Sequence, residues 1–222
     1  MNSSQLEGDW PNLLDRALAA LDTLPQETAW SWGGGTALAV RLDHRVSLDI
    51  DIFLADGDDL RQLLPTVNPA VRAMTDNWQQ PGHYLKLLFA EGEVDFIAAL
   101  SRTGQPSDAW PWRGRLLPLE TTAEILAKKL HWRGSRALAR DVFDLEAARR
   151  FDKAGFEAAL AAEPAGAGRV ADVITRRENR LRKELPLAVR PTAKGAGILD
   201  LDLLDLAAAL RDAGEGSSLR GA

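Results

Sequence analysis

The stretch from Gly33 to Phe53 reads GGGTALAVRLDHRVSLDIDIF, and it decides the fold. A glycine turn is followed by a predicted short helix over 36–42. An alternation of apolar and acidic residues over 47–54 is then typical of a β-strand. Because strand side chains alternate between faces, Asp49 and Asp51 are expected to project from one face. This order of elements favours a mixed α/β core.

The paired acids of this strand favour a metal site. Two carboxylates this close repel each other unless a cation lies between them. The chain has no cysteine and only three histidines, so the ligands of such a site must be carboxylates, which favour hard cations such as Mg²⁺. The alternative is an exposed strand face with two solvated acids.

The glycine turn suits a phosphate group. The backbone N–H groups of Gly34, Gly35 and Thr36 open a helix whose positive end attracts phosphate oxygens, and a larger side chain would keep the phosphate away from the backbone. An ordinary turn is the alternative. A triphosphate held there would place its metal beside the two acids. Ser47 is expected on the same strand face as these acids, where it could touch a phosphate.

Composition excludes several classes of protein. The chain has 222 residues, of which 45% are hydrophobic and 27% are charged, as in ordinary globular proteins. This excludes a disordered or fibrous chain, and no apolar run reaches the roughly 20 residues of a membrane span. The first residues lack the basic and apolar regions of a secretory signal. Together with the absence of cysteine, this predicts a cytoplasmic protein.

Charge is distributed unevenly along the chain. The formal net charge is −5, but residues 113–190 contain 17 Lys and Arg against 11 Asp and Glu. The remainder is correspondingly acidic. Such asymmetry indicates contact with a nucleic acid, and the alternative is a set of solvated helix faces.

The rest of the pattern divides the chain into two parts. Apolar runs over 84–90 and 93–100 predict a β-hairpin, and a Pro- and Trp-containing connector over 106–118 follows. We therefore place the boundary in this connector, with an α/β part over 1–112 and a helical part over 113–222.

The second part has helical patterns throughout. Thr121-Thr122-Ala123-Glu124 is a capping box that begins a helix ending near Trp132. Further helical patterns lie over 140–151, 156–162, 169–185 and 199–213, and loops are expected over 163–168 and 192–197.

Asp95 is the natural third acid of the first part. It stands alone among apolar residues on the second strand of the predicted hairpin, where it could face the same site. A lone acid on an edge strand is the alternative. Lys86, on the first hairpin strand, is expected to share that face and to pair with an acid.

A second polar block, KLHWRGSRALARDVFDL, runs from Lys129 to Leu145. On a helix, Lys129 and Arg133 share one face, and Asp141 and Asp144 share another. A lysine and an arginine on one face can neutralise triphosphate oxygens, and Asp144 can orient Lys129 by pairing with it. The alternative is a set of interhelical ion pairs without a ligand.

The two blocks together resemble the AbiEii-type nucleotidyltransferases, the toxin family of type IV toxin–antitoxin systems within the DNA polymerase β-like superfamily. The first block carries the glycines and the Asp-apolar-Asp, and the second carries Lys-Leu, an Arg and Arg-Asp-x-x-Asp-Leu. The resemblance implies an α+β fold. It comprises a polymerase β-like mixed sheet with flanking helices and a helical C-terminal part that completes the active site. His44 and Arg45 match the family's His-Arg-x-Ser without an assigned role, and His44 is interpreted as a turn residue rather than a metal ligand.

The resemblance also implies an activity, which is transfer of a nucleoside monophosphate from an NTP to an acceptor hydroxyl with Mg²⁺ or Mn²⁺. The implied catalytic residues are Asp49, Asp51, Asp95, Lys129 and Asp144, with Asp49 and Asp51 as metal ligands and Asp95 as the base. The implied phosphate-binding residues are Gly34, Gly35, Thr36, Ser47 and Arg133.

The implied partners are an RNA acceptor, most plausibly the 3′ end of tRNA, and a cognate antitoxin protein. The arginine-rich helix over 174–185 would be a fitting RNA-facing surface. Two alternatives stay open: a small molecule or protein hydroxyl as the acceptor, and an NTP-binding module without catalysis. Most of the seven tryptophans are expected to serve packing rather than base stacking.

Overall fold

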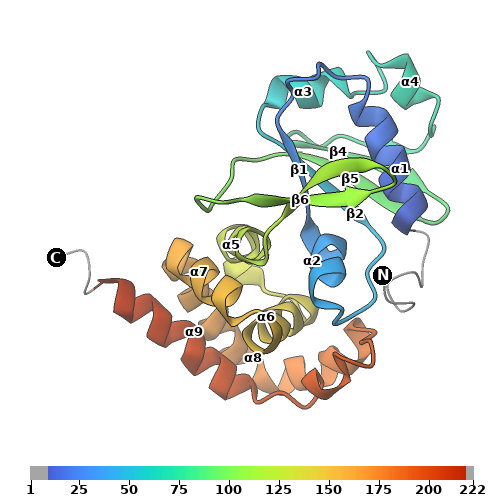
Figure 1. The fold of residues 1–222 in the computed structure, drawn as a ribbon. Helices are drawn as coiled ribbons and strands as arrows, with labels where there is room; N and C mark the ends of the chain where they lie inside the picture. The colour runs from blue at the N-terminus through green and yellow to red at the C-terminus, as the bar shows by residue number, and fades with distance from the viewer. Residues whose placement is uncertain (1–9, 219–222) are drawn as a thin grey trace. The chain divides into compact units, whose positions relative to one another are not determined.

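The structure is a computed structural model that describes residues 10–218, and it divides into two compact units. The first unit contains the residues up to Val40, 47–101 and 107–120. The second contains 41–46, 102–106 and the residues from Thr121 onward. The expected α+β class is confirmed, with a mixed sheet in the first unit and helices in the second (Figure 1).

A seven-stranded sheet forms the first unit, in the order β3-β4-β5-β2-β1-β7-β6. The pairs β2–β5 and β1–β7 are parallel, and the other neighbours are antiparallel. The strands are β1 (Trp30–Gly33), β2 (Ile50–Leu54), β3 (Trp78–Gln79), β4 (Tyr84–Phe89), β5 (Gly92–Ala98), β6 (Ser107–Trp112) and β7 (Arg115–Glu120).

Helices and tryptophans build the core around this sheet. The helices are α1 (Trp10–Leu21), α2 (Gly34–Leu42), α3 (Gly57–Gln62) and α4 (Pro69–Arg72). The apolar face of α1 packs against β2 and β5 (Figure 1). Four indole rings meet with neighbouring centroids 5.4–5.6 Å apart, so packing is the use of these tryptophans: Trp10, Trp32, Trp110 and Trp112.

Two sequence predictions about this unit need correction, and one is confirmed. The hairpin is confirmed as β4–β5. The expected connector over 106–118 is wrong, because most of these residues belong to the paired strands β6 and β7. The first unit accordingly extends to Glu120. The predicted strand over 47–54 begins only at Ile50.

The second unit is helical. Its elements are α5 (Thr122–Arg133), a 3₁₀ turn (Gly134–Arg136), α6 (Ala139–Phe151), α7 (Lys153–Ala162), α8 (Pro164–Ala188), a second 3₁₀ turn (Ala196–Ile198) and α9 (Leu203–Ser218). The Thr121 half of the predicted capping box is confirmed, since its side chain accepts a hydrogen bond from the backbone N–H of Glu124. The other half is wrong, because the Thr121 N–H donates to the Pro106 carbonyl and the Glu124 carboxylate accepts from the backbone N–H groups of Arg102 and Thr103. The expected loop over 163–168 is wrong, because α8 already begins at Pro164. None of the helices described in either unit combines the length and apolar character that crossing a membrane requires.

Candidate active site

A polar row crosses the sheet of the first unit. The strand register aligns Lys86 with Asp95, Asp95 with Asp51, and Asp51 with Gly33. Residues paired across neighbouring strands share a face of the sheet. The structure therefore places the side chains of Asp51 and Asp95 at neighbouring positions on one face, with Lys86 next to Asp95.

The environment of Asp95 disfavours its charged form. Burial and, next, the negative charge of Asp51 raise the pKa of Asp95 to about 6, although Lys86 opposes this shift. The Lys86 Nζ lies 3.1 Å from Asp95 Oδ2 and also pairs with Glu93. Asp95 Oδ1 is buried and has no hydrogen-bond partner among the described residues. A cation bound here would offset the repulsion between the two carboxylates and give the unsatisfied oxygen a partner.

We expect Asp95→Asn to raise stability and lower activity together. The folded-state pKa of Asp95 lies above its ordinary value of 3.8, so this group contributes most to stability below pH 4 and loses that contribution as the pH rises through 6. In metal-free buffer the variant should therefore be more stable than the wild type by about 1–3 kcal/mol at pH 7, with a smaller difference at pH 4. If Asp95 is the base that the resemblance implies, the same variant should also slow nucleotidyl transfer about 100-fold.

Urea denaturation at the two pH values measures the difference in stability. The exposed Asp76→Asn is the control, and it should leave both stability and transfer nearly unchanged. A stability gain that is equal at pH 4 and pH 7 would show that Asp95 is not the strained carboxyl.

Asp49 does not occupy the position that the sequence predicted. Because β2 begins at Ile50, Asp49 lies in the preceding segment, where its side chain is exposed and its Oδ1 accepts a weak hydrogen bond of 3.3 Å from the backbone N–H of Glu93. Asp49 and Ser47 thus lie before β2 and not within it, and a shared face of their side chains with Asp51 stays a prediction. Asp49 nonetheless reaches β5, the strand that carries Asp95.

The donor set fits a divalent cation only in part. Within residues 10–218, no group of three or more carboxylate or imidazole side chains is arranged closely enough to hold a metal ion. Asp51 and Asp95 do form a neighbouring pair of hard oxygen donors whose mutual repulsion a cation would remove. These residues fit a cation held by carboxylates, and Asp51 would be its main ligand.

The glycine turn lies directly against Asp51. Gly34 begins α2 with a φ of +74°, in the left-handed region that favours glycine. A Cβ atom at Gly34 would collide with the Asp51 carboxylate, so this carboxylate lies against the backbone at the start of α2. Thr36 is buried, and its hydroxyl donates a 2.6 Å hydrogen bond to the carbonyl of Asp49. The Thr36 side chain thus ties the start of α2 to the segment before β2.

Glu120 is a further acid in this region that the sequence did not single out. It is fully buried at the end of β7, and it accepts a 2.7 Å hydrogen bond from the Ser31 hydroxyl. A side chain on Gly33 would collide with the Glu120 carboxylate. The alternation of Leu117 and Leu119 before Glu120 was the signal for a strand, and Pro118 obscured it.

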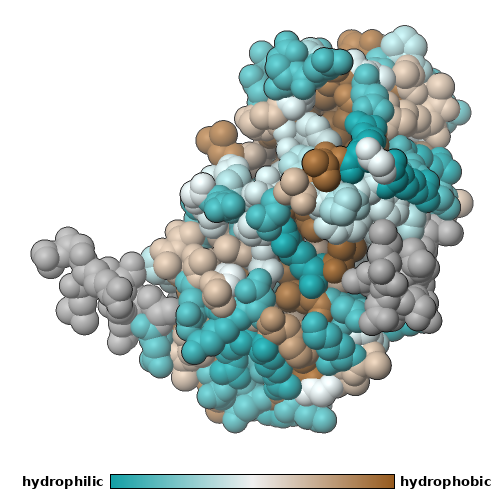
Figure 2. Space-filling model, in the orientation of Figure 1, coloured by the Kyte–Doolittle hydropathy of each residue, from teal (hydrophilic) through white to brown (hydrophobic). Residues whose placement is uncertain are grey.

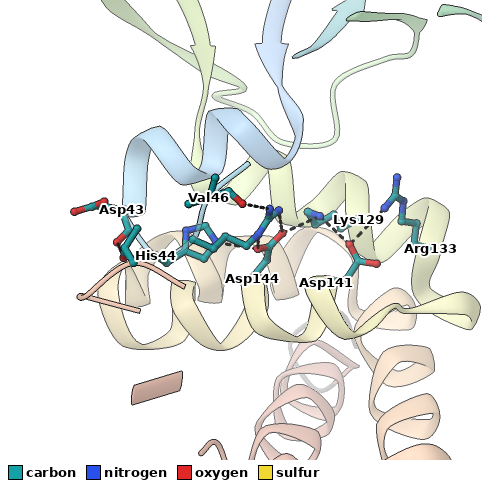
Figure 3. A network of polar contacts seen from close by, with 9 residues as sticks. Asp43, His44, Val46, Lys129, Arg133, Asp141 and Asp144 are labelled. Atoms are coloured by element: carbon teal, nitrogen blue, oxygen red, sulfur yellow. Dashed lines mark hydrogen bonds and ion pairs between the residues drawn. The ribbon is translucent and has the colours of Figure 1, made fainter. Parts of the chain in front are cut away.

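The second polar block forms a network between α5 and α6 (Figure 3). Lys129 Nζ lies 2.8 Å from Asp141 Oδ1 and 3.0 Å from Asp144 Oδ2. Arg133 reaches the same Asp141 oxygen at 3.5 Å. The predicted pairing of Lys129 with Asp144 is therefore present. His44 and Arg45, which the sequence left without a role, also contact Asp144.

Ion pairing keeps the network charged despite its burial. Burial alone would raise the pKa of Asp144, but the positive charges of Arg45 and Lys129 hold it well below its usual range. For Lys129, burial would lower the pKa, but Asp141 and Asp144 raise it above the ordinary value. Lys129 is consequently a protonated cation whose side chain is 13% exposed.

Comparisons with known proteins agree with this fold. Residues 16–89 match the model of a family described as nucleotidyl transferase AbiEii toxin, type IV TA system. The match includes the glycine turn, Asp49 and Asp51, and it ends before Asp95 and the block that begins at Lys129. The expected resemblance to AbiEii-type nucleotidyltransferases is confirmed by this match. A search of the curated proteins finds no match.

Two solved structures resemble the chain over most of its length. The solution structure of the antibiotic-resistance factor ANT(2″)-Ia has a TM-score of 0.52 at 17% identity and covers 76% of this chain and 97% of its own. The crystal structure of ANT(2″)-Ia in complex with adenylyl-2″-tobramycin has a TM-score of 0.51 at 17% identity, with coverages of 70% and 97%. At this identity the likeness establishes the fold.

Proposed function

We propose that this chain, a nucleotidyltransferase by its AbiEii match and its fold, transfers a nucleoside monophosphate from an NTP to a hydroxyl group of RNA. The observation that carries nucleotidyl transfer is the position of the Asp51 carboxylate, which lies against the backbone of Gly34 and beside Asp95. This arrangement unites a phosphate-binding helix start with paired carboxylates.

The proposed metal ligands are Asp51 and Asp49, and the metal is Mg²⁺ or Mn²⁺. When bound, this metal would supply Lewis-acid polarisation of the phosphoryl oxygens and neutralise part of their charge. The backbone N–H groups of Gly34, Gly35 and Thr36 would bind the β- and γ-phosphates, whose negative charge the start of α2 favours.

In the proposed reaction, the acceptor oxygen attacks the α-phosphorus of the NTP and forms a new P–O bond. The bond from the α-phosphorus to the oxygen that bridges to the β-phosphate breaks, and pyrophosphate leaves. The proton of the acceptor hydroxyl goes to the Asp95 carboxylate. Asp95 is suited to this role because it lies directly beside Asp51 in the strand register.

Lys129 and Arg133 are the proposed cations for the triphosphate. Both lie at the accessible side of their network, where Lys129 is 13% exposed and Arg133 is 48% exposed. The resemblance of the second block and the surplus positive charge of the network support this role. Asp144 acts through Lys129 and is a positioning residue.

The basic surface of α8 supports RNA as the acceptor. Ile174–Leu185 contains five Arg and Lys residues and two Glu residues. Four of these cations are exposed: Arg176, Arg180, Arg182 and Lys183. The surface over α8 and α9 is largely hydrophilic in the view of Figure 2. Exposed cations on a helix are suited to RNA phosphates.

A small molecule is the second candidate acceptor. The fold resembles that of ANT(2″)-Ia, which is solved in complex with an adenylylated aminoglycoside, adenylyl-2″-tobramycin. The proposed catalytic residues would be the same for both acceptors. The family description adds the proposal that the chain is a toxin with a cognate antitoxin, and an antitoxin gene in the adjacent reading frame would support it.

Labelled nucleotides distinguish the candidate acceptors. Each of the four α-labelled NTPs is incubated with the protein and total RNA, and in parallel with RNA-free protein and small-molecule fractions. Label in RNA, concentrated in tRNA, supports the proposal. Label only in the RNA-free fractions supports the alternative, and no label in any fraction contradicts nucleotidyl transfer.

We expect a triple glutamine variant at Arg176, Arg180 and Lys183 to raise the KM for RNA about tenfold. The KM of this variant should also depend less on salt concentration, because each lost phosphate contact reduces the number of counterions that RNA releases on binding. The matched control removes three exposed cations elsewhere: Arg61, Arg72 and Lys153. An equal rise of the KM in both triple variants would show that α8 has no special role.

A further inference from the structure

His44 and Arg45 are polar residues in the loop after α2, yet both are buried. The His44 side chain is 0% exposed and that of Arg45 is 8% exposed. Within the described chain they share one partner, the carboxylate of Asp144, which is itself 0% exposed. Burying a guanidinium with a carboxylate is costly unless every polar atom is satisfied, so the arrangement calls for a physical explanation.

The Asp144 carboxylate is saturated by donors. Its Oδ1 accepts from His44 Nε2 at 2.8 Å and from Arg45 Nε at 2.6 Å. Its Oδ2 accepts from Arg45 Nη2 at 3.1 Å and lies 3.0 Å from Lys129 Nζ (Figure 3). A carboxylate has about four acceptor positions, and all four are used. Asp144 is therefore not available to bind a metal or a substrate.

Arg45 is likewise committed within the protein. Its fork binds both oxygens of Asp144, and its Nη1 donates to the Val46 carbonyl at 3.3 Å. Lys129 differs, because its ammonium has three N–H donors and only two contacts among the described residues, with Asp141 and Asp144. One donor of Lys129 remains for a ligand.

A distant segment holds the loop in place. The backbone N–H of Val46 donates to the carbonyl of Arg190 at 2.8 Å, and that of Thr192 donates to the carbonyl of His44 at 3.1 Å. The Thr192 hydroxyl donates to the carbonyl of Asp43 at 2.6 Å. These contacts lie on both sides of Arg45, so its position against Asp144 is fixed by residues after α8.

The charges of the network leave a surplus. Arg45, Lys129 and Arg133 are cations, whereas Asp141 and Asp144 are anions. His44 is neutral at pH 7, because burial lowers its pKa. Summed over these five residues the charge is +1, and Lys129 and Arg133 are more exposed than Arg45.

We propose that Arg45 is a charge-balancing and positioning residue, which neutralises Asp144 so that Lys129 and Arg133 keep a net positive charge for a phosphate group. Without Arg45, Asp144 would pair fully with Lys129 and the network would be neutral. Arg45 therefore strengthens phosphate binding without touching the phosphate. The phosphate as ligand rests on the proposed function.

The test measures binding of inorganic pyrophosphate to the full chain by calorimetry in metal-free buffer. Arg45→Met should weaken binding about tenfold, since a unit charge is removed a few ångströms away, and Arg45→Lys should change it less than threefold. Arg149→Met is the matched control, because Arg149 also binds both oxygens of a buried acid, Glu146, in the same unit. It should leave pyrophosphate binding unchanged.

A double variant tests the charge balance and covers the case in which Arg45→Met does not fold. Arg45→Met with Asp144→Asn removes one positive and one negative charge, so it should bind pyrophosphate within threefold of the wild type. If Lys129→Met abolishes binding but Arg45→Met does not weaken it, the role of Arg45 is contradicted while the phosphate site stands. If Lys129→Met binds as well as the wild type, the proposed role of Lys129 fails and the inference fails with it.

Discussion

Asp51→Asn should lower nucleotidyl transfer about a thousandfold or more while the protein stays folded. Asp51 is the proposed metal ligand in contact with the glycine turn, and asparagine keeps its shape but loses its charge. A metal ion contributes several kcal/mol to transition-state stabilisation. Every loss of about 1.4 kcal/mol slows the reaction tenfold. Transfer of label from an α-labelled NTP measures the loss.

A second readout of Asp51→Asn does not depend on activity. The like charge of Asp51 contributes to the raised pKa of Asp95, so this pKa should fall below 6 in the variant. An NMR titration of the Asp95 carboxyl carbon in metal-free buffer measures it. The exposed Asp76→Asn should change neither value. If transfer by Asp51→Asn is within tenfold of the wild type, Asp51 is not the central ligand.

Asp144→Ala should destabilise the chain by about 3–5 kcal/mol, the cost of leaving buried charges without their partner. The substitution leaves the fork of Arg45, one contact of Lys129 and the His44 ring without their shared acceptor. Because the folded-state pKa of Asp144 is lowered, its stabilising effect is complete above pH 4 and is lost only as the pH falls further. Urea denaturation at several pH values measures both features.

Asp172→Ala is the matched control for this prediction. Asp172 is 63% exposed and pairs with Arg211 at 3.2 Å in the same unit. A pair exposed to solvent contributes little, so the control should lose less than about 1 kcal/mol. If both variants lost the same free energy of unfolding, the buried Asp144 network would contribute no more to stability than an exposed ion pair.

The sequence predicted the elements whose signals are local. The β4–β5 hairpin and the Thr121 cap follow from short patterns, and the structure has both. The sequence left the facing of Asp95 toward Asp51 as a possibility, and it is the parallel pairing of the second hairpin strand with β2 that sets the two side by side.

Prolines and glycines predicted loops at two places where tertiary packing instead forms a strand and a helix. Pro111 lies in β6, an edge strand that tolerates proline, so the expected connector is instead part of the sheet. Pro164 occupies the first turn of α8, where its missing N–H costs nothing. Gly166 allows α8 to approach α5 closely, since a Cβ there would collide with the carbonyl of Leu130.

The buried network was beyond local patterns. Arg45 and Asp144 are 99 positions apart in the chain, and no periodicity shows that two adjacent polar residues of a loop are buried. The second block gave Lys129, Arg133, Asp141 and Asp144 but not the contact of Asp144 with Arg45. Only the fold brings the loop at His44 and Arg45 to α6.

The most direct test of the account compares α-labelled with γ-labelled NTPs in a deproteinised extract of cells that lack the protein, because cellular kinases and polymerases would otherwise transfer label themselves. With Mg²⁺ and the wild-type chain, we expect α-label to enter an acceptor and γ-label to appear only in pyrophosphate, with neither event in Asp51→Asn. Transfer of γ-label to an acceptor, or α-label that stays in free nucleotide with all four NTPs, would contradict nucleotidyl transfer.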